Sequence, residues 1–559
     1  MTATEALAPL RVSAAEALHW DDRAELLVVG FGGAGACAAI EASERGLSVL
    51  ALERFAGGGA TALSGGVVYA GGGTPYQQQA GYNDSSTAMF DYLRQEVGEA
   101  VAATTLRDFC ERSCEQLAWL ERQGVAFEAS VPPHKTSYPS DQYYLYYSGN
   151  EAVPAYAAQA APAPRGHRSK GPGMSGASLF AALKNSALSR GARLQQQCEV
   201  RRLILGPGER VLGVEAWQLP PDSRAARWHR RLSRWATAIH MYAPPLADRL
   251  RARLRRIELS HAERRLIRAE RGVLLSAGGF IFNPELVQQH APQYLAGLPL
   301  GTTGCDGSGI RLGQGVGGAL ARMDKVSAWR FINPPLAWAR GLIVNGSGQR
   351  YCNEEVYGAT LGHAMVEEQG GRAILILNRA LVREALRQVG PGKVWQFQRL
   401  PVLLNLLANA KRAASPAALA EHCGLPSAQL EQSLAEYNRG ARGEVADAFG
   451  KSPAMLASLE QGPWYALDLS FDSRLFPCPV ITLGGLRVCE RSGQVLDAAG
   501  TAIAGLYSAG RNAVGIASNL YVSGLSLADC VYSGRRAAAH LATQIQPATA
   551  RSGEQQCNE

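Results

Sequence analysis

The chain has 559 residues, of which 19% are charged and 47% hydrophobic, as in an ordinary globular protein large enough for more than one domain. This balance excludes a disordered or fibrous chain. The eleven cysteines are scattered and form no Cys-x-x-Cys pair, so we expect free thiols in a reducing cytoplasm, with no disulfide framework and no metal site. The first twenty residues lack an apolar signal-peptide core, and no apolar run reaches the ~18 residues of a membrane span, which also favours a cytoplasmic protein.

The segment from Glu25 to Glu53 has the strand, glycine turn and acid of a dinucleotide-binding unit. An apolar run enters Gly30-Phe-Gly32-Gly-Ala-Gly35, an Ala-rich helix follows, and a second apolar strand ends at Glu53. The glycines permit a tight turn and close approach to a pyrophosphate, and the acid can bind ribose hydroxyls. We expect a dinucleotide held by Gly30, Gly32, Gly33, Ala34, Gly35 and Glu53.

A second loop rich in glycine and hydroxyl residues follows at once, from Arg54 to Gly66. Such a loop adds backbone and hydroxyl donors for phosphate and is typical of FAD proteins rather than NAD domains. Ala60-Thr61-Ala-Leu-Ser64-Gly-Gly resembles the flavin-contacting loop of the fumarate reductase/succinate dehydrogenase flavoprotein superfamily. Members with covalent flavin carry a His where Ala60 stands, so the resemblance implies non-covalent FAD. The contacts expected from this loop are Arg54, Ala60, Thr61, Ser64, Gly65 and Gly66.

Residues 86–124 show the apolar periodicity of helices, and a Pro- and Tyr-rich loop follows over 131–164. Its tyrosines can line an aromatic pocket or fill a loop core, and both interpretations stay open. They are Tyr138, Tyr143, Tyr144, Tyr146 and Tyr147. A helix from 175, a strand over 194–200 and a hairpin of 200–205 with 210–216 come next. We expect Val200 in this meander to contact the cofactor.

A basic insertion over 222–268 carries the chain's positive charge. Its arginines outnumber its acids by nine, whereas the whole chain has a formal charge of +8. Apolar residues punctuate the arginines, and Pro244-Pro245 separates two stretches, so we predict a helical hairpin with an apolar stripe. Three interpretations remain open: a solvated insertion, a contact with an anionic membrane surface, or a patch for nucleic acid or protein.

Beyond the insertion, several motifs continue the resemblance. The strand over 272–280 ends in a glycine turn, and Ala277 and Gly278 are expected near the flavin. Asp306 lies in a turn similar to the superfamily's Gly-Asp-Gly. The stretch 342–357 resembles the hairpin that opens the superfamily's capping domain, and 373–460 reads as mostly helical.

The fold class implied is α/β, with a Rossmann-like FAD-binding domain of the glutathione-reductase-like class interrupted by an α+β capping, or catalytic, domain. The expected boundaries are an N-terminal tail at 1–20, the first part of the FAD-binding domain at 21–300, the capping domain at 301–463, the second part of the FAD-binding domain at 464–545 and a flexible tail at 546–559.

The residues that superfamily members use on dicarboxylates are missing. Ile481-Thr482-Leu483 stands where the dicarboxylate-binding His is found, and Val356, Tyr357 and Gly358 follow Asn353-Glu354 where a proton-delivering Arg is found. Apolar residues cannot clamp a dianion. Arg350, which precedes the Asn-Glu pair, is expected to be structural, as is His167. A neutral, apolar ketone suits this site better.

The C-terminal run Ser518-Asn519-Leu-Tyr521-Val-Ser523-Gly524-Leu-Ser526 is similar to the Ser-Asn-x-Tyr-Val-Ser-Gly-Leu-Ser of Δ4-(5α)-3-ketosteroid dehydrogenases. Tyr357 stands where related 3-ketosteroid dehydrogenases place a tyrosine. The resemblance implies that a 5α-3-ketosteroid is dehydrogenated between C4 and C5. We expect Tyr521 to stabilise the 3-keto oxygen, and Ser523 or Tyr357 to relay the α proton, aided by a lowered tyrosine pKa or by coupling to solvent. Further flavin contacts are expected from Gly510, Gly524, Leu525, Ser526 and Leu527.

Other functions remain open at this stage. The runner-up is a Δ1-3-ketosteroid dehydrogenase, followed by a fumarate- or enoate-type reductase and by an FAD-bearing module that binds RNA or protein through the basic insertion. The expected partner is a lipophilic steroid ketone, with peripheral contact at the inner face of the membrane through the insertion. Nucleic acid is not expected, and the sequence does not indicate an electron acceptor.

Overall fold

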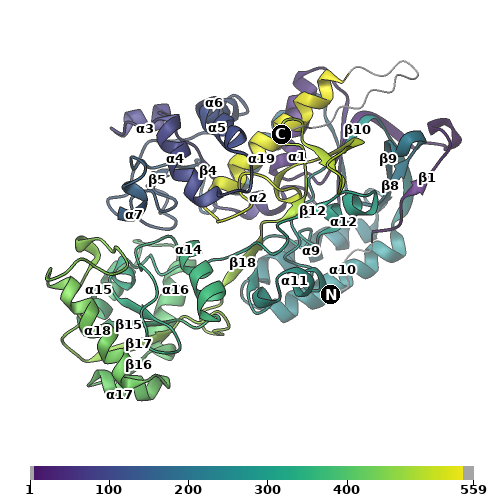
Figure 1. Ribbon diagram of the computed structural model, residues 1–559. Coiled ribbons are helices and arrows are strands. Elements are labelled where there is room, and N and C mark those ends of the chain that lie inside the picture. Colours follow the sequence, from purple (N-terminus) through teal and green to yellow (C-terminus); the bar gives the residue numbers. More distant parts are fainter. Residues whose placement is uncertain (1–5, 545–559) are drawn as a thin grey trace.

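The computed structural model describes residues 6–544 and has two bodies (Figure 1). The larger one contains the dinucleotide-binding motif, and the smaller one, drawn in green, contains residues from the middle of the chain. The predicted flexible tail at 546–559 lies outside the described residues. None of the helices in the described range has the length and hydropathy needed to cross a bilayer.

A large mixed sheet organises the first body. Its strand order is β1-β8-β9-β10-β2-β3-β7, and β21 joins it by pairing with β10 and β20. The run β10-β2-β3-β7 is parallel, so the carboxyl ends of β2 and β3 meet at one edge. The strands are β1 (Leu10–Arg11), β2 (Asp22–Val29), β3 (Val49–Glu53), β7 (Arg193–Gln196), β8 (Cys198–Leu205), β9 (Val211–Gln218), β10 (Glu263–Leu275), β20 (Gln494–Leu496) and β21 (Ala502–Ser508).

Two helices from opposite ends of the chain pack on this sheet. Helix α1 follows the glycine turn, and α19 follows Gly524. Their small residues allow close contact, since a Cβ added at Gly534 in α19 would lie 2.4 Å from the carbonyl oxygen of Ala34 in α1. The helices around the sheet are α1 (Gly33–Glu44), α2 (Gly59–Leu63), α8 (Gly176–Ser189), α11 (Pro284–His290), α12 (Ser308–Gly315) and α19 (Leu525–Thr543).

A helical lobe lies beside α19 and carries the tyrosine-rich loop (Figure 1). The helices predicted over 86–124 are present as α4, α5 and α6. Of the five loop tyrosines, Tyr146 lies in β5, which pairs with β6. The elements are β4 (Val67–Tyr69), α3 (Pro75–Gln79), α4 (Ser86–Val97), α5 (Ala103–Glu111), α6 (Ser113–Arg122), β5 (Leu145–Tyr146), α7 (Pro154–Ala157) and β6 (Gly166–Arg168).

The basic insertion forms the predicted helical hairpin, α9 (Arg224–Ile239) and α10 (Pro244–His261). Leu232, Ala236, Leu250 and Leu254 are the buried residues between the two helices. The predicted limit at residue 268 is wrong, because β10 already begins at Glu263 and pairs there with β9. The alternation of arginines with buried Ile267 and Ala269 marks this strand.

The second body, which we call the cap, is built on the sheet β14-β15-β17-β16. It is reached through two small sheets, β11-β18-β13 and β12-β19, which join residues 298–328 to 479–486. The elements are β11 (Leu298–Pro299), β12 (Leu320–Ala321), β13 (Val326–Ala328), α13 (Leu336–Ala339), β14 (Leu342–Val344), α14 (Gly358–His363), β15 (Ile374–Asn378), α15 (Arg379–Gln388), α16 (Gln396–Leu404), β16 (Lys411–Ala413), α17 (Pro416–Cys423), α18 (Ser427–Ala441), β17 (Trp464–Asp468), β18 (Pro479–Thr482) and β19 (Gly485–Leu486).

Three boundaries differ from expectation. Strand β17 begins at Trp464, where the return to the first body was predicted, but it pairs with β15 inside the cap. At the other end, β12 pairs with β19 in the connecting sheets, so the cap sheet starts later than residue 301. The segment predicted as an N-terminal tail contains β1, which pairs with β8. Short strands with distant partners leave no periodicity in the sequence, which explains these errors.

Candidate active site

The glycine turn between β2 and α1 has the geometry that a pyrophosphate requires. Gly30 has a φ of +91°, and a Cβ there would lie 2.7 Å from the Cα of Ala277. At Gly35 a Cβ would lie 2.2 Å from the carbonyl oxygen of Gly30. Helix α1 begins at Gly33, directly after this turn, so its N-terminus faces the carboxyl edge of the sheet.

Glu53 lies at the end of β3 beside this turn. One carboxylate oxygen accepts a hydrogen bond from the Phe31 N–H at 2.8 Å, and the other accepts from Phe55 N–H at 2.9 Å. Burial raises the pKa of Glu53. Each oxygen keeps a further lone pair, which is compatible with the predicted contact to a ribose hydroxyl.

The second loop lies against the first. The Gly33 N–H donates to Thr61 Oγ1 at 3.1 Å, which places Thr61 at the N-terminus of α1. Ser64 Oγ accepts from the Gly66 N–H, and Tyr138 from the tyrosine-rich loop donates to the Gly65 carbonyl oxygen at 2.9 Å. The two predicted loops are therefore neighbours in the structure, and the Thr61 hydroxyl lies where a ligand at the N-terminus of α1 would meet it.

The C-terminal segment completes this region. Gly524 precedes α19 with a φ of +90°, and a Cβ there would lie 2.8 Å from the Tyr69 nitrogen. In the first turn of α19, Leu525 is buried and Ser526 Oγ is buried without a hydrogen-bond partner among the described residues. Gly510 has a φ of +61°, and a Cβ added there would lie 3.0 Å from the Ala34 Cβ. An unsatisfied hydroxyl at a helix N-terminus is suited to a polar ligand.

These features fit FAD. Most of the residues predicted to bind it lie in the glycine turn, the second loop, the 277–278 turn and the start of α19, which are neighbours in the structure. Ala60 carries no imidazole, so the side chain at that position offers no covalent attachment to a flavin. Across residues 6–544, His, Cys, Asp and Glu side chains form no group of three suited to a metal ion.

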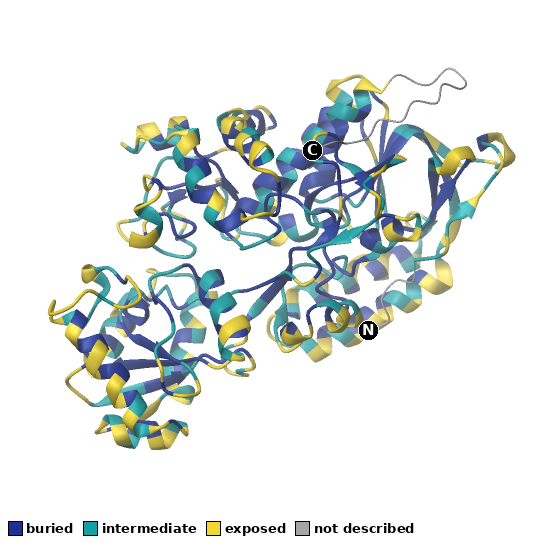
Figure 2. Ribbon diagram, viewed as in Figure 1, coloured by how far each residue is buried: buried dark blue, intermediate teal, exposed yellow. Residues whose placement is uncertain are grey.

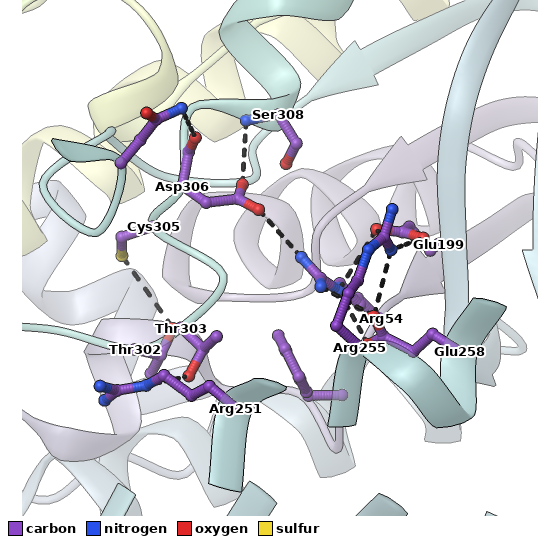
Figure 3. Close-up of polar contacts among 12 residues, drawn as sticks. Arg54, Glu199, Arg251, Arg255, Glu258, Thr302, Thr303, Cys305, Asp306 and Ser308 are labelled. Atoms are coloured by element: carbon purple, nitrogen blue, oxygen red, sulfur yellow. Dashed lines mark hydrogen bonds and ion pairs between the residues drawn. The ribbon is translucent and has the colours of Figure 1, made fainter. Parts of the chain in front are cut away.

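Arg54 and Asp306, both predicted as cofactor contacts, form an ion pair with each other (Figure 3). Their side-chain atoms are 2.9 Å apart, and Asp306 also accepts a hydrogen bond from the Ser308 N–H. Val200 lies nearby in β8, next to Glu199, which also contacts Arg54. These side chains therefore order the elements behind Glu53, a structural role that their motifs did not reveal.

Four hydroxyl groups gather where the cap meets the first body. Ser523 Oγ lies 3.3 Å from the hydroxyl of Tyr146. Tyr521 and Tyr357 belong to one aromatic group with Trp329 and Phe331, whose rings are 5.7 Å apart and contact Tyr521 and Tyr357 respectively. The structure thus places the three residues predicted to be catalytic near one another and adds Tyr146, while their roles stay a prediction.

Aromatic rings from the cap lie against these hydroxyls. The ring of Trp329 is 4.6 Å from that of Tyr521, and the ring of Phe331 is 5.6 Å from that of Tyr357. Trp329 and Phe331 follow β13, a segment in which sequence analysis found no motif. Apolar faces beside hydroxyl groups suit an apolar ligand with one polar end.

Burial raises the pKa of all three tyrosines, to about 12 for Tyr521 and well above the ordinary value for Tyr357 and Tyr146. All three are neutral hydrogen-bond donors at physiological pH. Of the two aids expected for the proton relay, a lowered tyrosine pKa does not fit these apolar surroundings, which disfavour a phenolate, so coupling to solvent is the one that stays a prediction.

Asn150 and Glu96 hold both tyrosine-bearing segments in place. The Tyr357 N–H donates to Asn150 Oδ1 at 2.6 Å, and Asn150 Nδ2 donates to Glu96 Oε1 at 2.9 Å. The backbone carbonyl oxygen of Glu96 accepts from the Leu520 N–H at 3.1 Å, next to Tyr521. A buried amide and carboxyl thus link the segment before Tyr521 to the start of α14 in the cap.

Other sequence predictions have clear outcomes. Arg350 pairs with Glu354 and Asp447 inside the cap, as expected of a structural residue. His167 is fully buried between Thr74 and the Arg165 carbonyl oxygen, and burial lowers its pKa to about 4, which also indicates a structural role. The ten cysteines in the described range are free thiols.

Most of this chain is similar to a known protein family and to a relative of known function. Residues 25–524 match the family described as "FAD binding domain". A protein from Comamonas testosteroni named "3-oxo-5-alpha-steroid 4-dehydrogenase" is 42% identical over 512 residues, covering 90% of this chain and 95% of that protein. The chain belongs to this family of FAD-binding flavoenzymes. It is an FAD-dependent oxidoreductase, with an α/β FAD-binding domain and a cap.

Solved structures agree with this family. The 3-ketosteroid-Δ4-(5α)-dehydrogenase from Rhodococcus jostii RHA1, solved with 4-androstene-3,17-dione, superimposes with a TM-score of 0.81 at 31% identity, covering 96% of this chain and all of that one. A 3-ketosteroid Δ1-dehydrogenase from Sterolibacterium denitrificans reaches a TM-score of 0.63 at 20% identity, covering 93% of this chain and 99% of that chain. The second likeness concerns the fold alone.

Proposed function

We propose that this flavoenzyme dehydrogenates a 5α-3-ketosteroid and introduces the C4–C5 double bond. The observation that carries this proposal is the group of four hydroxyls, from Tyr521, Ser523, Tyr357 and Tyr146, beside the aromatic rings of the cap. The names of the Comamonas testosteroni relative and of the Rhodococcus jostii structure support the same reaction.

The site is unsuited to a dicarboxylate, the substrate of the fumarate-type alternative. Ile481 and Leu483 are buried, and Thr482 Oγ1 accepts a hydrogen bond from the Phe280 N–H at 3.0 Å. A dianion would need cations or imidazoles at this place. The apolar segment is instead part of the connecting sheets that lead into the cap.

Tyr521 is proposed to bind the ketone. Removing a proton next to a carbonyl places negative charge on the oxygen, and a hydrogen-bond donor aimed at that oxygen stabilises the charge. Tyr521 suits this role because its raised pKa, about 12, keeps the phenol protonated throughout the physiological range. Trp329, packed against Tyr521, can cover the apolar face of the steroid ring that carries the ketone.

Ser523, Tyr357 and Tyr146 are proposed to carry the α proton away. A single buried tyrosine is a poor base because its phenolate is destabilised. In a chain of hydroxyls each oxygen accepts one proton while it donates another, so no phenolate needs to accumulate. Ser523 Oγ, 3.3 Å from the Tyr146 hydroxyl, can pass the proton on in this way, and the last hydroxyl of the chain then releases a proton to solvent.

Bound FAD supplies the acceptor for the hydride that leaves the β carbon. The chain's own contribution is to place the steroid and hold the cofactor. Gly524 and Ser526 start α19, and its N-terminus presents N–H groups and one unsatisfied hydroxyl, which can orient the polar edge of the cofactor's ring.

The test is an anaerobic titration of the FAD-loaded enzyme with 5α-androstane-3,17-dione, following bleaching of the flavin and identifying the product. We expect bleaching and 4-androstene-3,17-dione. A double bond between C1 and C2 would show a Δ1 dehydrogenase instead. Bleaching by succinate and not by the steroid would refute steroid dehydrogenation altogether.

We also propose that the solvent-exposed side of the basic hairpin binds anionic lipid headgroups on the cytoplasmic leaflet of the membrane. Trp228 and Trp235 are 51% and 50% exposed on α9, and Tyr242 at the hairpin tip is 80% exposed. The exposed arginines of the hairpin are Arg224, Arg227, Arg230, Arg231, Arg234, Arg249, Arg253 and Arg256. Figure 2 shows exposed residues along α9 and α10.

This combination favours a lipid surface over a purely solvated hairpin. An open groove along α9 is lined by both tryptophans and by arginines. Tryptophan is favoured at the boundary of a bilayer, and a face rich in arginine is attracted to anionic headgroups. The hairpin's acids do not neutralise this face, because Asp248 pairs with Arg251 and Glu258 is buried.

Flotation with vesicles tests the contact. Vesicles containing phosphatidylglycerol should carry the enzyme upward, and vesicles of phosphatidylcholine alone should not. Replacing Arg227, Arg231 and Arg234 by Gln should abolish flotation, whereas Arg383→Gln, an exposed arginine of the cap, should leave it unchanged. Equal flotation of both variants, or no flotation of the wild type, would refute the contact.

A further inference from the structure

The inner face of the basic hairpin contacts Arg54 through Glu258 (Figure 3). Arg54 directly follows Glu53, the residue predicted to bind ribose. Its guanidinium lies 2.8 Å from Glu258 of α10, 2.9 Å from Asp306 and 3.4 Å from Glu199 of β8. One side chain thus joins the end of β3, the meander, the 303–308 turn and the hairpin.

Two further arginines complete this group. Arg255 of α10 lies 2.9 Å from Glu199 and 3.2 Å from Glu258, and Arg201 of β8 lies 2.5 Å from Glu199. We call the six residues the Arg54 cluster: Arg54, Glu199, Arg201, Arg255, Glu258 and Asp306. Its three guanidinium groups balance its three carboxylates.

The cluster is mostly buried, so each member depends on the others. The side chains of Glu199, Glu258 and Asp306 are 6%, 5% and 7% exposed. Burial acts to raise the pKa of Glu258, but the charge of Arg54 outweighs it and holds this pKa below the ordinary value. Removing one partner of such a group leaves a buried charge without compensation.

A second contact joins the hairpin to the same strand end. His229 of α9 lies parallel to the ring of Phe55, with ring centroids 5.7 Å apart, and its Nε2 is 3.0 Å from Glu258. The Phe55 N–H is also one of the two donors to the Glu53 carboxylate. The hairpin therefore contacts both residues that follow Glu53, and one of them holds Glu53 directly.

From these contacts we propose that the basic hairpin, α9 and α10, retains FAD, and we call it the clasp. Its contact with the end of β3 is held by the ion pair between Glu258 and Arg54, and this contact slows the release of FAD. Closing the clasp fixes Arg54 and Phe55, and through them it fixes Glu53 in the position that receives the ribose. An open clasp leaves the end of β3 without its support, and the cofactor dissociates faster. Coupling of this kind is reciprocal, so bound FAD must also stabilise the closed hairpin.

The first test uses the unaltered enzyme. Amide hydrogen exchange is compared between the FAD-loaded and the FAD-stripped protein, over 224–261 and over a remote reference, α17 and α18 of the cap. We expect FAD to slow exchange in both hairpin helices and to leave the reference unchanged. Slower exchange in the 30–35 turn with no change in the hairpin would overturn the proposal.

The second test is a variant with a matched control on the same helix. Glu258→Gln removes one charge of the cluster with little change in shape, whereas Arg256→Gln removes an exposed charge. We expect FAD to dissociate at least tenfold faster from Glu258→Gln, measured by the fluorescence of released FAD, and at the wild-type rate from Arg256→Gln. Equal rates in a folded Glu258→Gln protein would refute the clasp, and if this variant does not fold, the exchange experiment decides.

Discussion

Glu96 offers a direct test of the buried contacts that hold the two tyrosine-bearing segments. Its carboxyl is fully buried and accepts hydrogen bonds from Tyr92 and Asn150, and Oε2 has no partner among the described residues. Burial raises the pKa of Glu96 to about 7. The perturbation is Glu96→Gln, which keeps an oxygen for both donors and cannot ionise.

The magnitude follows from the difference between the folded and unfolded pKa. An unfolded chain releases the proton of this glutamate near pH ~4.3, whereas the folded protein releases it near 7. Between these values the folded state binds more protons, so stability falls as pH rises, by about 3–4 kcal/mol in total, and is level above pH 7. Glu96→Gln should lose this part of the pH dependence.

The assay is the melting temperature of FAD-loaded wild type and variant at one scan rate, from pH 5 to pH 8. The wild type should lose about 2 degrees relative to Glu96→Gln over this range, because a chain of this length has a large entropy of unfolding. The neighbouring groups that act on Glu96 are Glu151 and Lys135, and they are present in both proteins. If the melting temperatures of the two proteins change with pH in parallel, Glu96 does not change protonation between pH 5 and pH 8. That result would refute the prediction.

Three further predictions concern the hydroxyl group and the start of α19. Tyr521→Phe should lower kcat by about 10²–10³ with little change in steroid binding, measured by stopped-flow reduction of the flavin, and an unchanged kcat would remove Tyr521 from its role. Tyr146→Phe should lower kcat by about tenfold or more and reduce the solvent isotope effect on proton transfer, whereas a purely structural Tyr146 would leave that isotope effect unaltered. Gly524→Ala should reduce both FAD content and melting temperature, because the new Cβ would lie 2.8 Å from the Tyr69 nitrogen, and full FAD content would contradict this.

The residues predicted to bind the cofactor could be named from the sequence because they lie in local motifs, and their contacts with FAD stay a prediction. The turn from Gly30 to Gly35, the loop around Thr61 and the start of α19 each have their glycines at fixed spacing, and the structure brings them together at one edge of the sheet. Backbone conformation at such positions depends on the residue itself, so it can be read without knowing the fold.

The remaining parts of the site depend on contacts between distant segments. Tyr146 meets Ser523 across 377 positions, and Arg54 meets Glu258 across 204. Tyr146 was recognised as one of five loop tyrosines, but its neighbour could not be identified. Glu96 and Asn150 carried no motif, and only their burial beside Tyr357 reveals their importance. A buried polar residue is informative once the fold is known.

The groups proposed to react are divided between two bodies of the molecule. Tyr521 and Ser523 come from the segment that follows the cap, while Tyr357 directly precedes α14 within it. Neither body alone assembles the complete set, so evolution or engineering can tune turnover by altering the short sheets that join them, without touching any residue that meets the steroid. Substitutions along β13 and β18 are therefore places to look for variants with changed rates and unchanged selectivity.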